Sequence, residues 1–308
     1  MIFQRTLRRA VTVNGVGLHS GKDIRMVIRP ARPGKGIVFL RTDVEGCPEI
    51  KANYSNVVST QLATTLACGK ITISTVEHVL AALNALGVDN ALIEVGGPEV
   101  PILDGSAAGY CEAIFEVGLE SQLKSKSFLA LRKRVECRLD DKWAIAEPAS
   151  RFEIHASIKW EHPAIGYQEF RYIDGRTKFA EVAGARTFGF MKDVERMKSM
   201  GLARGGSLSN AVVLDDQLVL NPEGLRFQDE FVRHKVLDAI GDFKLSGYSM
   251  LGSFRLHRAG HDLHVQLVSE ILKDRSNYEI IDTTFTRERE FVRPQLSPMA
   301  RPKLAASY

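Results

Sequence analysis

The sequence predicts an α+β fold made of two similar domains. In both halves of the chain, segments that alternate polar and apolar residues are followed by segments of helical periodicity. Each half also carries one histidine-bearing helix at a comparable place, which is a weak internal repeat. At 308 residues the chain is long enough to build two cores. We therefore expect the helices to be buried in the middle, with the two histidine-bearing helices near one another.

The first half begins with strands and continues with two strand–helix units. The first forty residues alternate as strands do, and Asn14-Gly15 predicts a two-residue hairpin turn between two of them. A glycine directly after an apolar periodic segment is typical of a helix end, so Gly87 and Gly118 predict where two helices stop. The expected elements are strands at 71–73 and 91–95 and helices at 74–86 and 106–117.

A polar segment without periodicity, residues 120–127, separates the two halves and is the expected domain boundary. We expect an N-terminal domain at 1–122, a C-terminal domain at 128–285 and a flexible tail with proline and arginine at 286–308. The second half is expected to contain strands at 144–146, 152–160 and 254–257 and helices at 193–199, 229–243 and 262–272.

Composition excludes several classes of function. The net charge of +4 arises from 41 basic and 37 acidic residues spread along the chain, which argues against nucleic-acid binding. The four cysteines form no C-x-x-C pair, so neither a disulfide framework nor a cysteine zinc site is expected. Charged and polar residues interrupt the most apolar stretch, Val76 to Val95, and no transmembrane segment is expected. These features predict a cytoplasmic protein whose metal ligands, if any, are histidines and carboxylates.

The helix at 229–243 carries a polar row beside its apolar stripe. His234, Asp238 and Asp242 recur every fourth residue, so two potential metal ligands lie one turn apart. For a random helix, a solvated His–Asp pair is the more frequent explanation. A zinc hydrolase, however, needs three nitrogen or oxygen ligands and one open position, and a helix supplies two of them at this spacing.

Glu77-His78 is the best candidate for the remaining ligand, because it joins an imidazole to a carboxylate able to take a proton from water. The alternative is a capping box, in which Ser74 caps the helix and Glu77 reaches back to the Ser74 backbone N–H. Both explanations stay open at this point.

His261 lies at an expected strand-to-helix turn after Gly260. An isolated histidine in such a place is more often structural than catalytic. The other histidines are expected to be structural or solvated: His155 and His257 on strands, His264 on the last helix and His162 in a turn. The glycine-punctuated segments at 184–190 and 204–207 lack the spacing of a Rossmann or P-loop enzyme.

Five motifs occur in a fixed order along the chain: Gly15-Val16-Gly17-Leu18-His19-Ser20-Gly21, Ser74-Thr75-Val76-Glu77-His78, Pro101-Ile102-Leu103-Asp104-Gly105-Ser106-Ala107-Ala108, Ala185-Arg186-Thr187-Phe188-Gly189-Phe190, and Asp229 to Asp242. Together they closely resemble the zinc-dependent UDP-3-O-acyl-N-acetylglucosamine deacetylases of lipid A synthesis in Gram-negative bacteria. The resemblance extends from the N-terminus to about Leu272.

The resemblance implies two α+β domains with the helices inside and the active site between them. It also implies one catalytic Zn²⁺ per chain, held by His78, His234 and Asp238. The other roles that it implies are a general base at Glu77, an acid at His261 that protonates the leaving amine, a partner at Asp242 that holds His261 charged, and an oxyanion donor at Thr187.

The implied substrate is an acylated UDP-amino sugar, which loses its N-acetyl group as acetate. Its uridine diphosphate end is expected to contact Lys235, Lys142 and a stacking residue at Trp160. Phe188, Phe190 and Asp193 match the segment that lines the sugar and phosphate region, and the insert around Asp193 to Val213 would form an apolar passage for the acyl chain. Gln61 and Ala63 depart from the family in a substrate-facing loop.

Two alternatives differ in function from this one. A related zinc amidohydrolase would share the metal site and act on another N-acyl sugar. A two-domain binding protein would use the same three residues for a structural metal, although structural zinc sites usually have four ligands and are rich in cysteine. We expect a monomeric enzyme, and iron is a possible alternative to zinc at a nitrogen and oxygen site.

Overall fold

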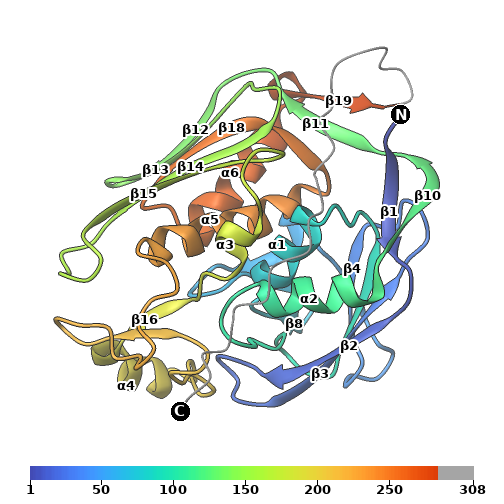
Figure 1. Ribbon diagram of the computed structural model, residues 1–308. Coiled ribbons are helices and arrows are strands. Elements are labelled where there is room, and N and C mark those ends of the chain that lie inside the picture. The colour runs from blue at the N-terminus through green and yellow to red at the C-terminus, as the bar shows by residue number, and fades with distance from the viewer. Residues whose placement is uncertain (284–308) are drawn as a thin grey trace.

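The computed structural model describes residues 1–283, which fold as α-helices between β-sheets (Figure 1). The first part of the chain contains helices α1 (Glu77–Ala85) and α2 (Ala108–Val117), a 3-10 turn at Tyr54–Asn56, and strands β1 (Phe3–Leu7), β2 (Val11–Val16), β3 (Asp23–Pro30), β4 (Ile37–Arg41), β5 (Glu49–Lys51), β6 (Val57–Ser59), β7 (Thr65–Cys68), β8 (Ile71–Ile73), β9 (Ala91–Val95) and β10 (Leu119–Ser125). The predicted α+β class is confirmed.

The second part contains strands β11 (Ser127–Leu131), β12 (Val135–Leu139), β13 (Lys142–Glu147), β14 (Phe152–Lys159), β15 (Tyr167–Ile173), β16 (Phe188–Phe190), β17 (Val212–Leu214), β18 (Ser249–His257) and β19 (Tyr278–Asp282). Its helices are α3 (Ala180–Ala183), α4 (Met191–Ser199), α5 (Glu230–Phe243) and α6 (His261–Lys273), with 3-10 turns at Lys244–Ser246 and Arg275–Asn277. The expected strands and helices of this part are all present; most differ by one or two residues at their ends, but the strand expected at 254–257 begins earlier, at Ser249.

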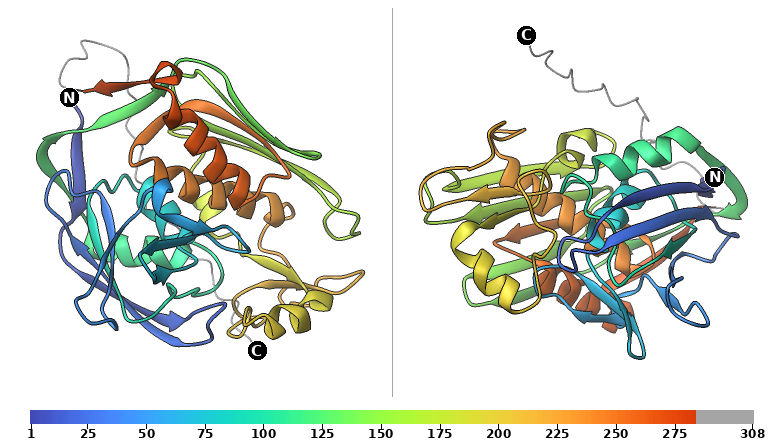
Figure 2. Two further views of the ribbon diagram at one scale, coloured as in Figure 1. Left: turned by 180° about the vertical axis from the view of Figure 1, so that it is seen from behind. Right: turned by 90° about the horizontal axis from the view of Figure 1, so that it is seen from below.

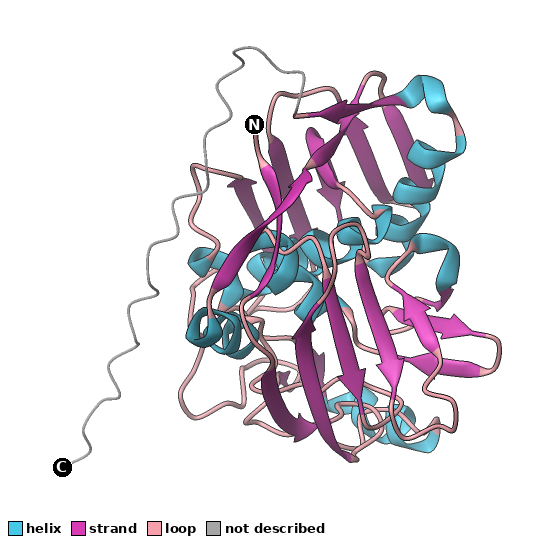
Figure 3. Ribbon diagram, turned by 90° about the vertical axis from the view of Figure 1, so that its right-hand side faces the viewer, coloured by secondary structure: helices cyan, strands magenta, loops and turns pink. Residues whose placement is uncertain are grey.

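Two larger sheets lie on either side of the central helices α1 and α5 (Figures 1 and 3). Within residues 1–283, one sheet has five strands in the order β2-β3-β9-β4-β5. The other has seven strands, with β12-β13-β18-β11-β19 in order and with β14 paired to both β18 and β15. Strand β9 alternates buried and half-buried residues, as a strand with one face on a core should. The core therefore lies between the two sheets, where the helices fill it.

Helices α1 and α5 pack against each other at the centre of the molecule (Figure 1). Every residue of α5 except Arg233 and Lys235 is buried, and α1 is buried from Glu77 to Leu83. A helix enclosed on all sides has little need of a polar face, and polar residues that remain there require partners. Gly241 allows the close approach, because a Cβ atom at that position would lie 2.0 Å from the carbonyl oxygen of Glu77.

A smaller unit projects from one end of the molecule and contains β16, α4 and β17 (Figures 1 and 2). Strands β16 and β17 are parallel, and α4 has no buried residue. Large apolar side chains on this unit are exposed: Met191 by 48%, Met200 by 54% and Leu208 by 39%. The unit corresponds to the predicted insert.

Two local predictions are wrong. Asn14 and Gly15 do not form a hairpin turn; they lie within β2, where they pair with Arg25 and Ile24 of β3. The helix at 74–86 begins later than expected, at Glu77, and Ser74 does not cap it. Instead, the Ser74 hydroxyl contacts the Thr65 hydroxyl at 2.9 Å. The capping box is therefore absent, and the Glu77 carboxylate is directed elsewhere.

The polar segment between the halves forms strand β10, which pairs antiparallel with β1 (Figure 1). Residues 119–125 are mostly exposed there, which explains their polar composition. The predicted division into domains at 1–122 and 128–285 stays a prediction. The predicted tail, residues 286–308, lies outside the described residues.

Candidate active site

Three potential metal ligands come together between α1 and α5. The Nε2 atom of His234 lies 3.3 Å from Asp238 Oδ1, and the Nε2 atom of His78 lies 3.7 Å from the same oxygen. The two imidazole rings stand almost perpendicular, with their centroids 5.0 Å apart. All three side chains are buried. The sequence placed these residues in different halves of the chain, and the fold brings them to one point.

The hydrogen bonding of this cluster favours a cation at its centre. His234 Nδ1 donates to the carbonyl oxygen of Ala185 at 3.0 Å, which leaves the lone pair of Nε2 facing Asp238. Burial, as the main cause, lowers the pKa of His234 to about 3, so no proton is expected between the two atoms. Among the described residues, Asp238 Oδ1 is buried and has no hydrogen-bond donor. A divalent metal would satisfy both groups.

Lys235 completes the surroundings of Asp238. Its Nζ atom lies 2.9 Å from Asp238 Oδ2, the oxygen that faces away from His234. Burial would raise the pKa of Asp238, but the neighbouring His234 and Lys235 outweigh it and hold this pKa well below its ordinary value. Asp238 is thus an ionised carboxylate with one oxygen paired and the other available.

The Glu77 carboxylate lies beside the cluster and is held by Thr64. Its Oε2 atom accepts a hydrogen bond from the backbone N–H of Thr64 at 3.1 Å. Its Oε1 atom lies 3.8 Å from His261 Nε2. Burial raises the pKa of Glu77 above its ordinary value, although His261 and His78 oppose this. A buried carboxylate of raised pKa next to a metal cluster is suited to accept a proton.

Asp242 accepts hydrogen bonds from three side chains. The Nδ1 atoms of His261 and His264 lie 2.8 Å and 2.9 Å from its Oδ2 atom, and the Thr64 hydroxyl donates to its Oδ1 atom at 2.6 Å. Burial would lower the pKa of His261, but the carboxylates of Asp242 and Glu77 raise it to about 10. The imidazole is therefore protonated and directs its Nε2–H towards Glu77.

Asp242, His261 and His264 also lie close enough to form a second metal group. We interpret them as a hydrogen-bond network, since one carboxylate oxygen receives an N–H bond of ordinary length from each ring. His264 had been expected to be structural or solvated. It is fully buried, and its Nδ1 atom bonds to Asp242, the partner of His261. The position of His264 on an amphipathic helix did not indicate this contact.

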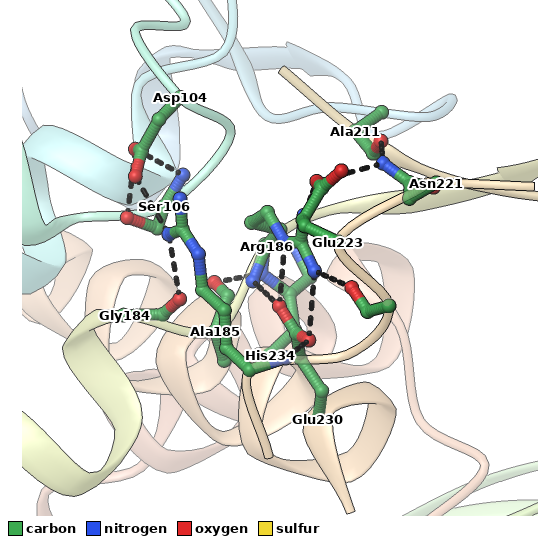
Figure 4. Close-up of polar contacts among 12 residues, drawn as sticks. Asp104, Ser106, Gly184, Ala185, Arg186, Ala211, Asn221, Glu223, Glu230 and His234 are labelled. Atoms are coloured by element: carbon green, nitrogen blue, oxygen red, sulfur yellow. Dashed lines mark hydrogen bonds and ion pairs between the residues drawn. The ribbon is translucent and has the colours of Figure 1, made fainter. Parts of the chain in front are cut away.

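Arg186 supports the cluster from the side of the insert (Figure 4). Its buried guanidinium donates to Glu230 Oε1 at 2.9 Å and to the carbonyl oxygen of Gly224 at 2.7 Å. Its backbone N–H also donates to Glu230, at 3.0 Å, which fixes the chain directly after Ala185. The carbonyl that orients His234 is thereby held in place. The sequence contained Arg186 in a recognised motif, but nothing in its spacing indicated this role.

The aromatic residues expected to line the substrate region are partly gathered beside the metal cluster. The Phe188 ring lies 6.4 Å from His234 and 5.6 Å from Trp160, and Lys235 Nζ lies 5.5 Å above it. These residues therefore border the cluster on one side.

The other expected site residues make contacts outside the cluster. Phe190 contacts His162 at 5.7 Å, and Asp193 pairs with Arg196 on the exposed helix α4. Lys142 is the first residue of β13. The next residue, Trp143, pairs with His257 of β18, which precedes His261 by four residues. Thr187 accepts from Val212 N–H and donates its own N–H to Gly105, so it links the insert to the first half.

No helix among residues 1–283 has the length and apolar character needed to cross a membrane.

Comparison with known proteins agrees with this geometry. The sequence profile of the UDP-3-O-acyl N-acetylglycosamine deacetylases matches residues 4–273. The UDP-3-O-acyl-N-acetylglucosamine deacetylase of Myxococcus xanthus is 49% identical over 279 residues, which is 90% of this chain and 89% of the relative. The protein of that name from Geobacter sp. (strain M21) is 47% identical over 92% of this chain and 93% of its own length. The one from Histophilus somni is 43% identical over 97% and 98%. The chain therefore belongs to the UDP-3-O-acyl N-acetylglycosamine deacetylase family.

Proposed function

We propose that this protein is a zinc-dependent hydrolase that removes the N-acetyl group from UDP-3-O-(3-hydroxyacyl)-N-acetylglucosamine in lipid A biosynthesis. The observation that carries the proposal is the buried cluster of His78, His234 and Asp238, in which a carboxylate oxygen without a donor faces an imidazole lone pair. Three ligands of this kind leave a coordination position open, as catalytic zinc sites do. The reaction consumes one water and yields the free amine and acetate.

His78, His234 and Asp238 would hold the metal. When bound there, zinc would polarise the acetamide carbonyl and lower the pKa of water to about 7. Glu77 would take the proton from the attacking water, since its carboxylate adjoins the cluster and its pKa is raised by burial. His261, held protonated by Asp242, would deliver a proton to the departing nitrogen. The Thr187 hydroxyl would donate to the oxyanion that forms on the carbonyl oxygen.

Substrate binding is proposed for the residues on the insert side of the cluster. Lys235 and Lys142 would contact the diphosphate, and Trp160, Phe188, Phe190 and Asp193 would line the sugar and uridine regions. The exposed apolar side chains of the insert, among them Met191 and Leu208, support a passage for the acyl chain there. All three ligands of the cluster come from one chain, so the site needs no second subunit, and we propose a monomeric enzyme. We also propose that the enzyme has two domains and works in the cytoplasm.

The experiment is to measure acetate release from the acylated UDP-amino sugar by the purified protein, together with its zinc content. We expect one acetate per substrate consumed and about one zinc per chain. A matched assay with UDP-N-acetylglucosamine, which lacks the acyl chain, tests whether the passage contributes. If the acylated substrate is not deacetylated while another N-acyl sugar is, the related amidohydrolase is correct. Full turnover in a rigorously metal-free sample would contradict the proposed chemistry.

A further inference from the structure

A cavity lies beside the C-terminal ends of helices α1 and α5. Its volume is about 510 Å³, within the usual range of small-molecule sites. Its lining includes Ala85 at the end of α1, whereas His78 lies seven residues earlier, or about 10 Å along the helix. No residue of the metal cluster lines it. The cavity opens near the N-terminus, where β1 and β10 pass between the two larger sheets (Figure 1).

Apolar side chains from both halves of the chain contribute to the lining: Phe3, Phe128, Phe152, Ile240, Phe243 and Leu251. The centroid of the Phe152 ring lies 6.3 Å from that of Phe243 and 5.4 Å from that of Phe254. These contacts between rings hold the aromatic wall in place. An apolar group that entered here would be removed from water on several sides.

Basic residues also line the cavity. Arg5, Lys126 and Arg151 occur there with a single carboxylate, Asp174, which gives a formal excess of positive charge. Within residues 1–283, the Arg151 guanidinium makes no hydrogen bond or ion pair, and only a longer-range attraction joins it to Asp174. A half-buried guanidinium without a partner, facing a cavity, is an available donor for an anion.

A buried lysine beside the cavity adds to this excess. The Nζ atom of Lys126 lies 2.9 Å from Asp89 Oδ1, and Lys244 is attracted to the same carboxylate. Lys244 is 5% exposed and, among the described residues, its ammonium makes no hydrogen bond or close ion pair. Burial, with a smaller contribution from Lys126, lowers the pKa of Lys244 to about 8. Two ammonium groups thus share one carboxylate beside the cavity.

We propose that this cavity is a second ligand site, which binds an amphiphilic anion consisting of an apolar chain and one carboxylate or phosphate head. The head would accept from Arg151 and lie close to Lys126, and the chain would pack on the aromatic wall. The site is independent of the proposed catalytic chemistry. A ligand there would contact Asn84 and Ile240, which join α1 to α5 through a hydrogen bond of 3.0 Å from Asn84 Nδ2 to the Ile240 carbonyl.

The test is a calorimetric titration of the full-length protein with decanoate, and separately with decyl phosphate, below their micellar concentrations. We expect one equivalent of one or both to bind at the cavity, and the tighter of the two identifies the head group. Inorganic phosphate, which lacks the chain, and decyltrimethylammonium, whose head is cationic, should bind at least about tenfold more weakly. Equal affinity for decyltrimethylammonium, or no binding of either anion, overturns the proposal.

Local variants separate this cavity from the passage near the metal. Arg151→Gln should weaken binding of the preferred anion about tenfold, because it removes a charged donor, and Arg151→Lys should restore part of the loss. Ser150→Phe, at an exposed lining position, should also weaken binding by filling the rim. Arg25→Gln is the matched control, since it removes an equal charge from an exposed residue that does not line the cavity.

Methyl NMR of the labelled protein gives the location directly. The Ile240 methyl resonances should shift on binding in the wild type, whereas those of Ile37, which does not line the cavity, should not. If Arg151→Gln and Ser150→Phe bind as tightly as the wild type and Ile240 is unaffected, the anion binds elsewhere and the proposal is wrong. Unchanged acetate release in both variants would show that they are folded.

Discussion

At the scale of single residues, Thr64 has contacts with both sides of the proposed proton transfer. Its backbone N–H holds Glu77, and its hydroxyl holds Asp242, the partner of His261. The contact with Asp242 was not predictable from the sequence, because 178 residues separate it from Thr64. The proximity of Glu77 to His78 and of Asp238 to His234 could be predicted, because adjacent residues and residues four apart on a helix lie close together before any tertiary structure is known.

Glu77→Gln should reduce turnover about 10²- to 10⁴-fold, because the amide keeps the shape of the side chain but cannot accept the proton from water. Helix α1 should be unaffected, since Glu77 does not form a capping box. Acetate release measures the loss, and zinc analysis serves as the control. Turnover at the wild-type rate would rule out Glu77 as the base.

His261→Ala should slow turnover about 10²-fold or more and leave the zinc content unchanged. The reason is that His261 hydrogen bonds to Asp242 and reaches no closer than 4.0 Å to Asp238. Steady-state kinetics and metal analysis on the same sample test both statements. A variant that has lost its metal would instead identify His261 as a ligand.

Thr64→Val should destabilise the protein by about 1–3 kcal/mol, because the buried Asp242 oxygen would lose its hydroxyl donor. The backbone bond to Glu77 would remain. Chemical denaturation measures the difference in the free energy of unfolding. Thr64→Ser keeps the hydroxyl and is the matched control; a Thr64→Val variant as stable as the wild type would show that this hydrogen bond does not contribute.

At the scale of elements, the helices were the most predictable and the edges of the sheets the least. Helices α1, α5 and α6 follow from helical periodicity and from the residues that end them. The prediction of a turn at Asn14-Gly15 was wrong. These residues favour turns, but here they pair with the neighbouring strand β3, and the strand continues through them. Strand β10 was missed because an exposed two-stranded ribbon needs no apolar alternation.

Gly241→Ala should separate α1 from α5 and thereby disturb the metal cluster. The added methyl group would meet the Glu77 backbone, which cannot move aside as a flexible side chain would. We expect a loss of about 1–3 kcal/mol in the free energy of unfolding and weaker zinc binding. Gly189→Ala is the control, since nothing lies within 4 Å of its Cβ position. An unchanged zinc affinity in Gly241→Ala would show that the contact between α1 and α5 does not determine the positions of the metal ligands.

At the scale of the whole molecule, the proposed metal would join segments that are far apart in the sequence. His78 comes from the first half, and His234 and Asp238 come from the second, so neither half contains all three ligands. The sequence could predict this division from the weak repeat. It could not predict the depth of burial, because the polar row on α5 has the spacing of a solvated face and is enclosed only when distant elements, among them α1 and α6, pack against it.

Removing the metal with a chelator should abolish acetate release and lower the melting temperature. A ligand that binds only the folded state stabilises it, by about 4 kcal/mol at a thousandfold excess over Kd. Calorimetry with and without one equivalent of zinc measures the shift, and His78→Ala should show none. A melting temperature independent of zinc in the wild type would contradict a site that spans both halves.

The first strand and the last described residues also meet. The Ile2 backbone N–H donates to the Thr283 hydroxyl at 3.2 Å, and that hydroxyl donates back to the Ile2 carbonyl at 2.8 Å. Residue 2 and residue 283 are therefore neighbours in space although they are far apart in the chain. A short peptide that joined these two residues would make the backbone a closed ring. New termini could then be placed at an exposed turn such as Gly175, so circular permutation would reorder this chain without altering its core.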